Sequence, residues 1–249
     1  MQLNFENETI LITGATRGIG EQIANDLYLL GATLILTGTK PKEIEKLNVL
    51  ATKNAQRKKY FCVDFSDERS LDLFLNELHA FERIDCLINN AGINRLNTID
   101  NAEILDWNEM LSVNLTAPFK LIKNVSEKMI ENNYGRILNV ASIFSKISKE
   151  RRSVYSATKF GLHGLTVGVS NDLARHNILV NSISPGFVLT ELTKKNLSVS
   201  EMDDLKNQVP ARRLGTVQDI SKVALFLISN LNQYLTGQNI IVDGGFTNV

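Results

Sequence analysis

Short apolar runs alternate along the chain with longer segments whose apolar residues recur at helical spacing. Short runs between polar or glycine-containing segments are typical of buried strands. The strands predicted in this way are Ile10–Thr13, Thr33–Thr37, Lys59–Val63, Ile84–Ile88, Arg136–Val140, Ile178–Ser182 and Asn239–Val242. Strands that alternate with helices build a parallel sheet covered on both faces. The pattern therefore predicts an α/β protein with one doubly wound, seven-stranded parallel sheet.

The helical segments are recognised by their apolar spacing and by their ends. The predicted helices are Gly18–Leu30, a segment opened by Pro41, one capped by Ser66 or Asp67, a region from Ala102 to Asn132 interrupted near Pro118, and one that carries Tyr155 and ends near His176. Residues 189–209 are polar and helix-prone but poorly patterned, which is typical of a flap over a site. No repeat or linker interrupts the alternation, so we expect residues 1–249 to form a single domain.

Composition narrows the function classes. Apolar residues make up 43% and charged residues 22% of the 249 residues, which is typical of a globular domain with a sizeable core. Lys plus Arg equals Asp plus Glu, 27 each, so no net field attracts nucleic acid or an anionic membrane. No run approaches the roughly 20 apolar residues of a membrane span, and residues 1–9 lack a basic-then-apolar leader. We therefore expect a cytoplasmic protein without nucleic-acid or membrane partners.

The cysteines and histidines give no sign of a metal site. Cys62 and Cys86 each lie inside an apolar strand-like run, so we expect two buried thiols rather than a disulfide. His79, His163 and His176 share no ligand spacing. A metal-independent protein is expected.

A glycine-rich loop, Thr13-Gly14-Ala15-Thr16-Arg17-Gly18-Ile19-Gly20, joins the first predicted strand to the first helix. Glycines allow a tight turn and close approach of the backbone to a pyrophosphate. The N–H groups and the positive dipole end of the following helix then face the phosphates. Three residues rather than one separate the first two glycines, unlike the common dinucleotide fingerprint. The loop nevertheless indicates nucleotide binding.

Tyr155 and Lys159 are four residues apart and would share one face of a helix. A nearby ammonium group favours the phenolate and lowers its pKa from about 10. A phenol tuned in this way can exchange a proton with a reacting oxygen, and Ser142 could donate a hydrogen bond to the same oxygen. An amphipathic helix with a surface lysine would show the same spacing, so the pair alone does not decide between the two interpretations.

Several motifs occur in register with one another, and together they resemble the classical short-chain dehydrogenase/reductase family over essentially the whole chain. They are the glycine loop, Asn89-Asn90-Ala91-Gly92 after the fourth strand, the set Asn114, Ser142, Tyr155 and Lys159, the acid Asp64, and Pro185-Gly186 with Thr190 beyond. The resemblance implies a single-domain Rossmann fold and an oxidoreductase that transfers a hydride between a nicotinamide and a carbonyl or secondary alcohol. It also implies a homo-oligomer, a tetramer or a dimer.

The resemblance assigns roles to individual residues. Tyr155 would be the proton donor in reduction, Lys159 would lower its pKa and bind the nicotinamide ribose, Ser142 would polarise the carbonyl, and Asn114 would kink its helix and fix a water that relays protons to Lys159. The cofactor contacts implied are Gly14, Thr16, Arg17, Gly18, Ile19, Gly20, Thr39, Asp64, Phe65, Asn90, Ala91, Gly92, Tyr155, Lys159, Pro185, Gly186, Val188 and Thr190.

The second predicted strand ends without the acid that selects NAD by binding the ribose 2′-hydroxyl. Gly38 stands where NAD-preferring relatives keep Asp, and the first carboxylate after it is Glu43. Arg17 stands where NADP-preferring relatives keep a basic residue, which can neutralise a 2′-phosphate, although a solvated loop charge would look the same. NADP(H) is therefore expected to be favoured over NAD(H).

The nearest resemblance within the family is to 3-oxoacyl-acyl-carrier-protein reductases, through residues 181–186 and the ending from Leu235 to Gly245. The basic residues that dock a carrier protein would fall near Asn133 and His176, neither of which is reliably cationic. A sugar or nucleotide-sugar dehydrogenase is the alternative. A non-catalytic, cofactor-binding regulatory protein is a more remote one.

The connection between Ser142 and Tyr155 is rich in cations. It holds Lys146, Lys149, Arg151 and Arg152 against Glu150 alone, and Arg95 could approach the same rim. A solvated loop or subunit contacts would explain the cluster, and so would a substrate with a carboxylate or phosphate group. The substrate contacts expected on the second interpretation are Arg95, Phe144, Arg152 and Phe187, with Arg152 the most direct.

Overall fold

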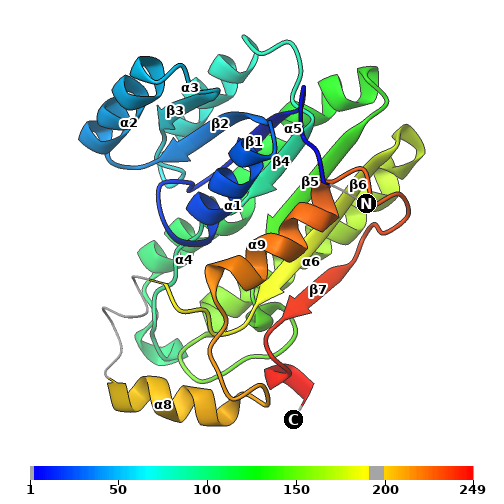
Figure 1. The fold of residues 1–249 in the computed structure, drawn as a ribbon. Coiled ribbons are helices and arrows are strands. Elements are labelled where there is room, and N and C mark those ends of the chain that lie inside the picture. The colour runs from blue at the N-terminus through cyan, green and yellow to red at the C-terminus, as the bar shows by residue number, and fades with distance from the viewer. Residues whose placement is uncertain (1–2, 191–198, 249) are drawn as a thin grey trace.

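The computed structural model describes residues 3–190 and 199–248 of the chain (Figure 1). Its centre is a parallel sheet of seven strands in the order β3-β2-β1-β4-β5-β6-β7. The strands are β1 (Thr9–Ile12), β2 (Thr33–Gly38), β3 (Lys58–Cys62), β4 (Cys86–Asn89), β5 (Gly135–Val140), β6 (Ile178–Pro185) and β7 (Asn239–Val242). The predicted doubly wound sheet is confirmed, and the sixth strand extends to Pro185, beyond the predicted end at Ser182.

Helices cover both faces of this sheet. They are α1 (Gly18–Leu29), α2 (Pro41–Lys53), α3 (Glu68–Leu78), α4 (Ile104–Leu111), α5 (Ala117–Glu131), α6 (Ser153–Leu173), α8 (Val199–Gln208) and α9 (Val217–Ile228). Helices α1 and α9 pack together on the face turned to the viewer in Figure 1. Side chains of α3, α5 and α6 belong to the core on the other face. Both faces of the central strands are therefore buried.

The strand β1 shows how its apolar run serves both cores. Successive side chains of a strand point to opposite faces. Ile10 and Ile12 accordingly join the core beneath α1 and α9, whereas Leu11 joins the core beneath α3, α5 and α6. A continuous apolar run, rather than an alternating one, is what a strand buried on both faces requires.

The long helical region predicted from Ala102 to Asn132 is divided by a turn of π-helix at Ser112–Thr116, between α4 and α5. Pro118 has no N–H to donate to the carbonyl of Asn114, four residues earlier, so the α-helical hydrogen-bond pattern cannot continue regularly there. The predicted interruption is confirmed, but it lies one turn before the proline, and Asn114 is at its centre.

Helix α9 is absent from the sequence predictions. It begins with a capping box, in which the Thr216 side chain accepts from Asp219 N and the Asp219 side chain accepts from Thr216 N. The pattern of a threonine followed three residues later by an acid was available in the sequence as a helix start. Of the predicted flap at 189–209, residues 191–198 lie outside the described residues, and α8 forms the second half.

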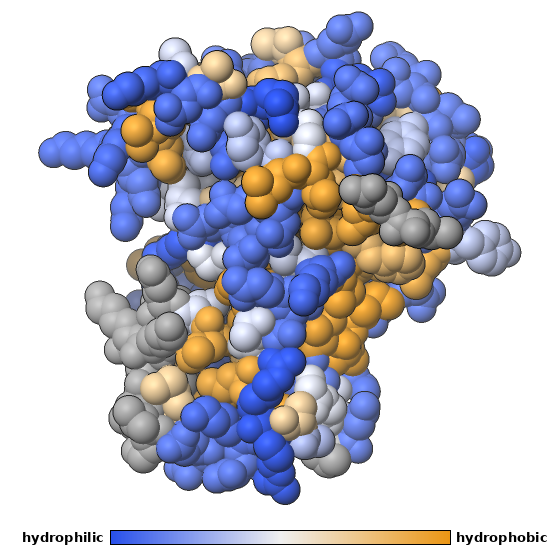
Figure 2. Space-filling view, viewed as in Figure 1, coloured by the Kyte–Doolittle hydropathy of each residue, from blue (hydrophilic) through white to orange (hydrophobic). Residues whose placement is uncertain are grey.

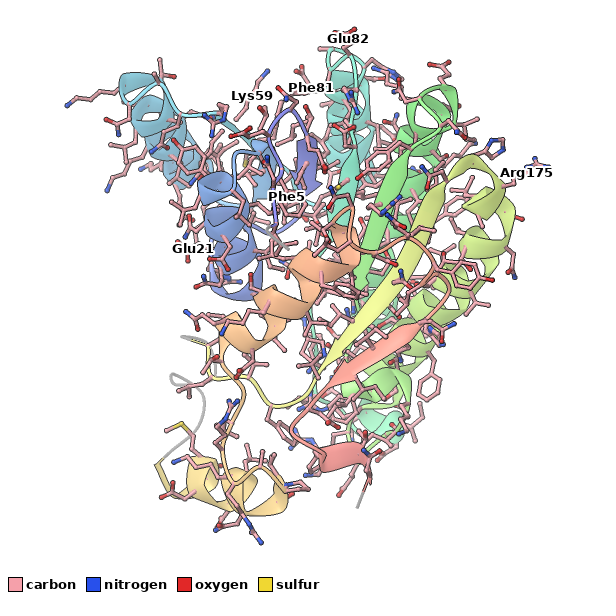
Figure 3. All side chains as sticks on the ribbon, turned by 45° about the vertical axis from the view of Figure 1, so that its right-hand side comes forward. Phe5, Glu21, Lys59, Phe81, Glu82 and Arg175 are labelled. Atoms are coloured by element: carbon pink, nitrogen blue, oxygen red, sulfur yellow. The ribbon has the colours of Figure 1, made fainter. Side chains whose placement is uncertain are left out.

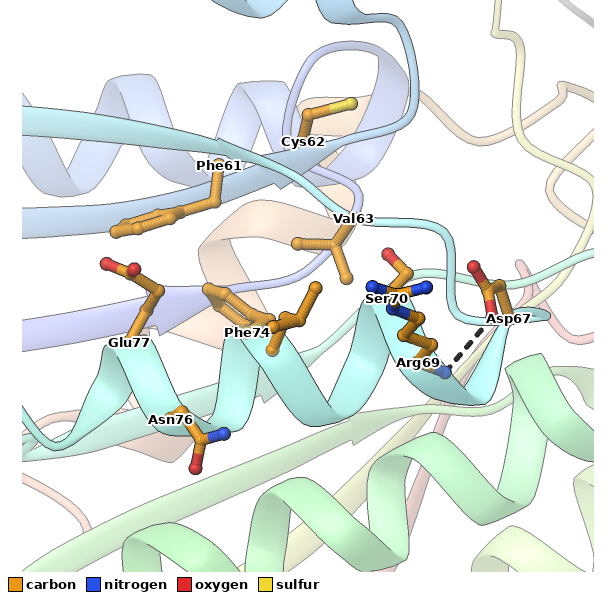
Figure 4. Close-up of a pocket in the computed structure, with 10 residues that line it drawn as sticks. Phe61, Cys62, Val63, Asp67, Arg69, Ser70, Phe74, Asn76 and Glu77 are labelled. Carbon is orange, nitrogen blue, oxygen red and sulfur yellow. Dashed lines mark hydrogen bonds between the residues drawn. The ribbon is translucent and has the colours of Figure 1, made fainter.

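The prediction that both cysteines are buried is wrong for Cys62. Cys86 is buried, whereas Cys62 is exposed because it ends the edge strand β3. A cavity of about 670 Å³ lies there between β3 and α3, lined by Cys62 together with Phe61, Val63 and Phe74 (Figure 4). The apolar residues around Cys62 in the sequence face this cavity and the core beside it, so they do not cover its thiol.

The face that carries α9 and β7 exposes apolar side chains. Figure 2 shows them as a band across the middle of this face, between hydrophilic regions above and below. Phe226 in α9 is 41% exposed. Among the described residues, no helix is long and apolar enough to cross a membrane.

Candidate active site

The candidate site lies where the parallel strands end at their carboxyl edge. Strand order reverses between β1 and β4, and ligands of open α/β sheets bind at this switch point. The Thr13 hydroxyl joins the two loops there, since it accepts hydrogen bonds from Asn90 N and Ala91 N, each at 2.9 Å. The Asn90 side chain donates in return to the carbonyls of Thr13 and Gly14, both at 2.9 Å.

The glycines of the loop are required by its geometry. Gly14 and Gly18 have φ values of 63° and 61°, a left-handed conformation that favours glycine. A Cβ atom on Gly20 would lie 2.4 Å from the Asn90 amide nitrogen, so no larger residue fits there. The loop therefore keeps its backbone open in front of α1, where a pyrophosphate can approach the N–H groups. Thr16, Arg17 and Ile19 lie in this loop and first turn, and Arg17 is exposed.

The end of β2 agrees with the expected absence of an acid. A Cβ atom on Gly38 would lie 2.5 Å from the Thr16 methyl group, so an aspartate at this position would require Thr16 to move. Thr39 and Asp64 are exposed at the ends of neighbouring strands. The Phe65 side chain is instead buried and packs edge-on to Phe74, with ring centroids 6.5 Å apart, so only its backbone is left for a cofactor contact.

Asn114 is fully buried in the π-helical turn. Its side chain accepts from Ile93 N at 2.9 Å and donates to Ile93 O at 2.9 Å and to the Thr158 hydroxyl at 3.1 Å. Thr158 in turn donates to Tyr155 O at 2.7 Å. Asn114 thus ties the segment after β4 to helix α6. The expected water relay to Lys159 stays a prediction.

Helix α6 places Lys159 inside the protein because Val154, Thr158 and Leu162 are on the same buried stripe. Only 3% of Lys159 is exposed. Its ammonium group donates to the carbonyl of Val140, at the end of β5, at 2.9 Å. A Cβ atom on Gly92 would lie 3.5 Å from the Lys159 Nζ and 3.4 Å from the Asn114 Oδ1. Gly92 thus leaves open a small space on which both groups converge.

Ser142 follows β5 and caps the short 3₁₀ turn Ile143–Ser145 by accepting from Phe144 N at 3.3 Å. Burial raises the pKa of Tyr155, while a hydrogen bond with Ser142 and the positive charge of Arg152 lower it. Burial also lowers the pKa of Lys159 to about 8. We expected Lys159 to lower the pKa of Tyr155, but Ser142 and Arg152 have this effect in the structure. The Lys159 ammonium group bonds to Val140 and lies 5.6 Å from the Tyr155 ring centroid.

The loop after β6 closes the other side of the site. Pro185 ends β6, and Gly186 packs so closely on Asp243 that a Cβ atom would lie 2.7 Å from the Asp243 side chain. Val188 is buried, and the Thr190 methyl group would lie 3.9 Å from a Cβ atom on Gly18. The loops after β1 and β6 thus approach each other. Phe187 turns edge-on to Phe246, with ring centroids 5.0 Å apart.

The predicted cation cluster does not act as one group. Arg95 forms ion pairs with Glu109 and Asp106, so the prediction that it contacts substrate is not supported. Acids of α4, about one helical turn apart, neutralise it. Arg151 donates to the carbonyl of Leu96 at 3.2 Å.

The remaining cations of the connection lie in different surroundings. Lys146 donates to the Asn248 side chain at 3.3 Å. Arg152 is half-buried and lies over the Phe144 ring, 5.0 Å from its centroid. Phe144 is itself edge-on to Tyr155, with ring centroids 6.1 Å apart. Of the five cations, Arg152 is the one whose contacts lead to Tyr155.

Sequence reasoning missed Thr158 and the Val140 carbonyl, which hold Asn114 and Lys159 in place. A buried threonine carries no distinctive sequence signal, and a backbone carbonyl carries none. The described residues hold no group of three or more His, Cys, Asp or Glu side chains that could bind a metal ion. The cavity beside Cys62 is lined by residues 61–77 of β3 and α3, none of which is a predicted catalytic residue.

Comparison with known proteins places this geometry in a family. A family model described as Enoyl-(Acyl carrier protein) reductase matches residues 14–247. The chain is 36% identical over 247 residues to a 3-oxoacyl-acyl-carrier-protein reductase of Aquifex aeolicus, covering 98% of this chain and 99% of that protein. The corresponding Escherichia coli reductase is 34% identical over 244 residues, 98% of each chain.

A solved structure agrees with this assignment. A gluconate 5-dehydrogenase from Burkholderia cenocepacia, in complex with NADP and tartrate, superimposes with a TM-score of 0.91 at 31% identity, covering 99% of this chain and 97% of that one. The family match and these full-length relatives agree with the glycine loop, the sheet order and the residues around Tyr155. The chain therefore belongs to the short-chain dehydrogenase/reductase family of oxidoreductases.

Proposed function

We propose that the protein is an NADP(H)-dependent reductase that converts the 3-oxo group of an acyl thioester to a hydroxyl group. The observation that carries the proposal is the placement of the Ser142 hydroxyl beside Tyr155 at the carboxyl edge of the sheet, where it lowers the pKa of the phenol. It occurs in a chain that matches 3-oxoacyl reductases over 98% of its length. The reaction consumes one carbonyl group, one hydride and one proton, and it yields a secondary alcohol.

The glycine loop and the loops after β4 and β6 would hold the nicotinamide dinucleotide, which when bound supplies the hydride to the carbonyl carbon. Ser142 donates a hydrogen bond to the carbonyl oxygen and holds it beside Tyr155. Tyr155 gives its phenolic proton to that oxygen as negative charge develops. Lys159, whose pKa is lowered to about 8, stands behind Tyr155 as the next proton donor, and Asn114 fixes the backbone around it.

The preference for NADP(H) is supported by Gly38 and Arg17. A carboxylate at position 38 would repel a 2′-phosphate. A side chain at this position would also be too close to Thr16, which disfavours an aspartate there. Arg17 is exposed at the N-terminus of α1, with a planar fork suited to phosphate.

The cofactor experiment compares the affinities for NADPH and NADH in wild type and in Arg17→Ala. A charge-assisted phosphate contact is worth roughly 1.5–3 kcal/mol, so the ratio of affinities should fall by about tenfold or more, through weaker NADPH binding. Lys53→Ala, at the far end of α2, is the control and should leave the ratio unchanged. A wild-type protein that binds NADH more tightly would contradict the cofactor assignment.

The decisive test of the reaction is NADPH oxidation with acetoacetyl-pantetheine thioester, followed by absorbance. Turnover that Tyr155→Phe abolishes is expected. If no thioester is reduced, the proposed substrate is wrong. If NADPH is oxidised with 5-oxogluconate instead, the reaction class stands, and a dehydrogenase of sugar acids replaces the acyl-thioester reductase as the proposed function.

The second candidate is a dehydrogenase of sugar acids. The observation that favours it is Arg152 beside Tyr155, and a structural relative is a gluconate 5-dehydrogenase in complex with NADP and tartrate.

One expected obstacle to carrier-protein docking is weaker than the sequence suggested. Arg175 is exposed and donates to the neighbouring His176 at 3.0 Å, and it points away from the end of α6 (Figure 3). A cation is therefore present beside His176.

The assembly and location of the protein stay predictions. The apolar band over α9 and β7 (Figure 2) supports a homo-oligomer, since large apolar patches mark association surfaces. The cytoplasmic location expected from the sequence belongs to the same proposal.

A further inference from the structure

Arg152 occupies an unusual position immediately before α6. Its guanidinium group lies over the Phe144 ring, 5.0 Å from the centroid, and Phe144 meets Tyr155 edge-on at 6.1 Å. The Arg152 charge also reaches the phenol itself, since it lowers the pKa of Tyr155. Phe144 therefore lies between the guanidinium group of Arg152 and the ring of Tyr155 and contacts both.

No anion within the described parts of the chain neutralises Arg152. Its guanidinium group has neither a carboxylate partner nor a hydrogen-bond acceptor among the residues from 3 to 190 and from 199 to 248. Burial lowers the pKa of Arg152; the interaction with Tyr155 raises it in part, and the charge of the adjacent Arg151 lowers it. A half-buried guanidinium without a partner is unfavourable, because its N–H donors lose water and gain nothing in exchange.

Two neighbouring arginines, in contrast, have acceptors within the chain. Arg95 is paired with Glu109 and Asp106. Arg151 donates to the Leu96 carbonyl. Among the described residues, the protein thus supplies acceptors for Arg95 and Arg151 but none for the guanidinium group of Arg152.

We propose that Arg152 forms an anion subsite beside Tyr155 and that the substrate carries a carboxylate a few bonds from the carbonyl that is reduced. This inference rests on the proposed carbonyl reduction and names the substrate class of that site. The contact with the Phe144 ring restrains the guanidinium group, and its N–H groups, which have no acceptor among the described residues, are available for a bidentate contact with a planar carboxylate. A purely aliphatic acyl chain would leave this charge half-buried and unpaired.

The carboxylate could belong to a free oxo acid or to the far end of an acyl chain held as a thioester. Matched pairs of substrates distinguish these sources. The first pair is 5-oxogluconate and the neutral ketose L-sorbose, and the second is the pantetheine thioester of 3-oxoglutarate and acetoacetyl-pantetheine. In each pair the readout is the ratio of kcat/KM for the anionic member to that for the neutral member, measured with NADPH.

Wild type should prefer the anionic member of at least one pair by about tenfold or more, because a charge-assisted hydrogen bond is worth roughly 1.5–3 kcal/mol. Arg152→Ala should bring that ratio close to one, chiefly through KM. The variant also raises the pKa of Tyr155, so both members will lose some kcat, and the ratio rather than either rate is diagnostic. Arg151→Ala, the matched control, should keep the wild-type ratio.

A second measurement does not depend on turnover. Malonate, a small dicarboxylate, should bind to wild type without added cofactor in a calorimetric titration, and Arg152→Ala should weaken this binding by about tenfold or more. A ratio near one in wild type for both pairs, or a ratio that persists in Arg152→Ala, would overturn the inference. If the thioesters are reduced but neither pair shows a preference for its anionic member, the proposed reduction survives and the anion subsite does not. If no substrate reacts, the malonate titration still decides on the subsite.

Discussion

Two groups of ionisable side chains, some buried and some half-buried, lie at opposite edges of the same sheet and differ in their charge partners. At the amino edge, Glu8 precedes β1, Asp85 precedes β4, and Arg136 lies at the start of β5. At the carboxyl edge, Tyr155 and Lys159 project from α6, with Arg152 before it. Both groups have lost water, but only the first is balanced in charge.

The amino-edge group finds most of its partners within the chain, although the Arg136 Nε has no hydrogen-bond partner among the described residues. Asp85 is paired with Arg83 and accepts from Thr9 N at 2.8 Å. Arg136 donates to the carbonyls of Gly135, Asn177 and Asn232 at 2.8–3.2 Å. Burial and the negative charge of Asp85 raise the pKa of Glu8, and contacts with Cys86, Arg136 and Tyr134 lower it. Two acids and two arginines thus share one network.

At the carboxyl edge, the described residues place no carboxylate against Lys159 or Arg152, and burial lowers the pKa of both. The difference indicates which group is structural and which awaits a ligand. A network of acids and cations paired within the chain stabilises the fold, whereas buried or half-buried cations without a carboxylate partner cost stability and gain a counter-charge only when an anionic ligand binds. The comparison predicts opposite consequences of mutation at the two edges.

The largest expected effect is on turnover at the carboxyl edge. Tyr155→Phe removes the transferable proton and should lower kcat by between about a hundredfold and ten-thousandfold. Because only one hydroxyl group is lost, the free energy of unfolding should change by less than about 1 kcal/mol. Steady-state kinetics and urea unfolding of the same preparation measure both quantities. Turnover like that of wild type would exclude Tyr155 as the proton donor.

The next effect is on stability at the amino edge. Arg136→Met removes a buried cation. The carbonyls of Gly135, Asn177 and Asn232 then lose their Arg136 donors, and Glu8 loses the nearby positive charge of Arg136. We expect a loss of about 3 kcal/mol or more in the free energy of unfolding. Arg175→Met, at an exposed position, is the control and should stay within about 0.5 kcal/mol of wild type. Equal stabilities of the two variants would mean that the amino-edge network is not stabilising.

The smallest change in the free energy of unfolding at neutral pH is expected for Lys159→Met. The lowered pKa of Lys159, about 8 against an ordinary value of 10.5, means that the unfolded chain binds more protons between these values. Wild-type stability should therefore rise as pH increases from about 8 to about 10.5, by up to about 3 kcal/mol. Below pH 8 the full desolvation cost is present.

Lys159→Met removes this desolvation cost but leaves the Val140 carbonyl unpaired, at about 1–3 kcal/mol. The two effects nearly cancel at pH 7, and wild type should become the more stable protein toward pH 10. Urea unfolding of both proteins at these two pH values is the measurement. A stability difference that does not change with pH would show that Lys159 titrates normally.

Much of the fold and the positions of the candidate site follow from the sequence. The apolar runs and glycine positions predict strands and turns because their causes act between residues close in the chain, through backbone sterics and side-chain periodicity. The loop Gly14–Gly20 and the spacing of Tyr155 and Lys159 on one helix are of this kind. Helix α9 could have been predicted in the same way, from the capping box formed by Thr216 and Asp219.

The partners of the side chains depend on the tertiary structure, because they come from segments distant in the chain. Nothing local to Arg95 indicates that Glu109 and Asp106 neutralise it. Cys62 is exposed because β3 lies at the edge of the sheet, and a strand's own composition does not state its place in the order. The pKa of Tyr155 is raised by burial, which depends on the surrounding fold, and lowered by Ser142 and Arg152, which lie near it in the sequence. The sequence by itself thus determined the elements and the chemistry they carry, and the packing of distant segments decided which charges stay free to act.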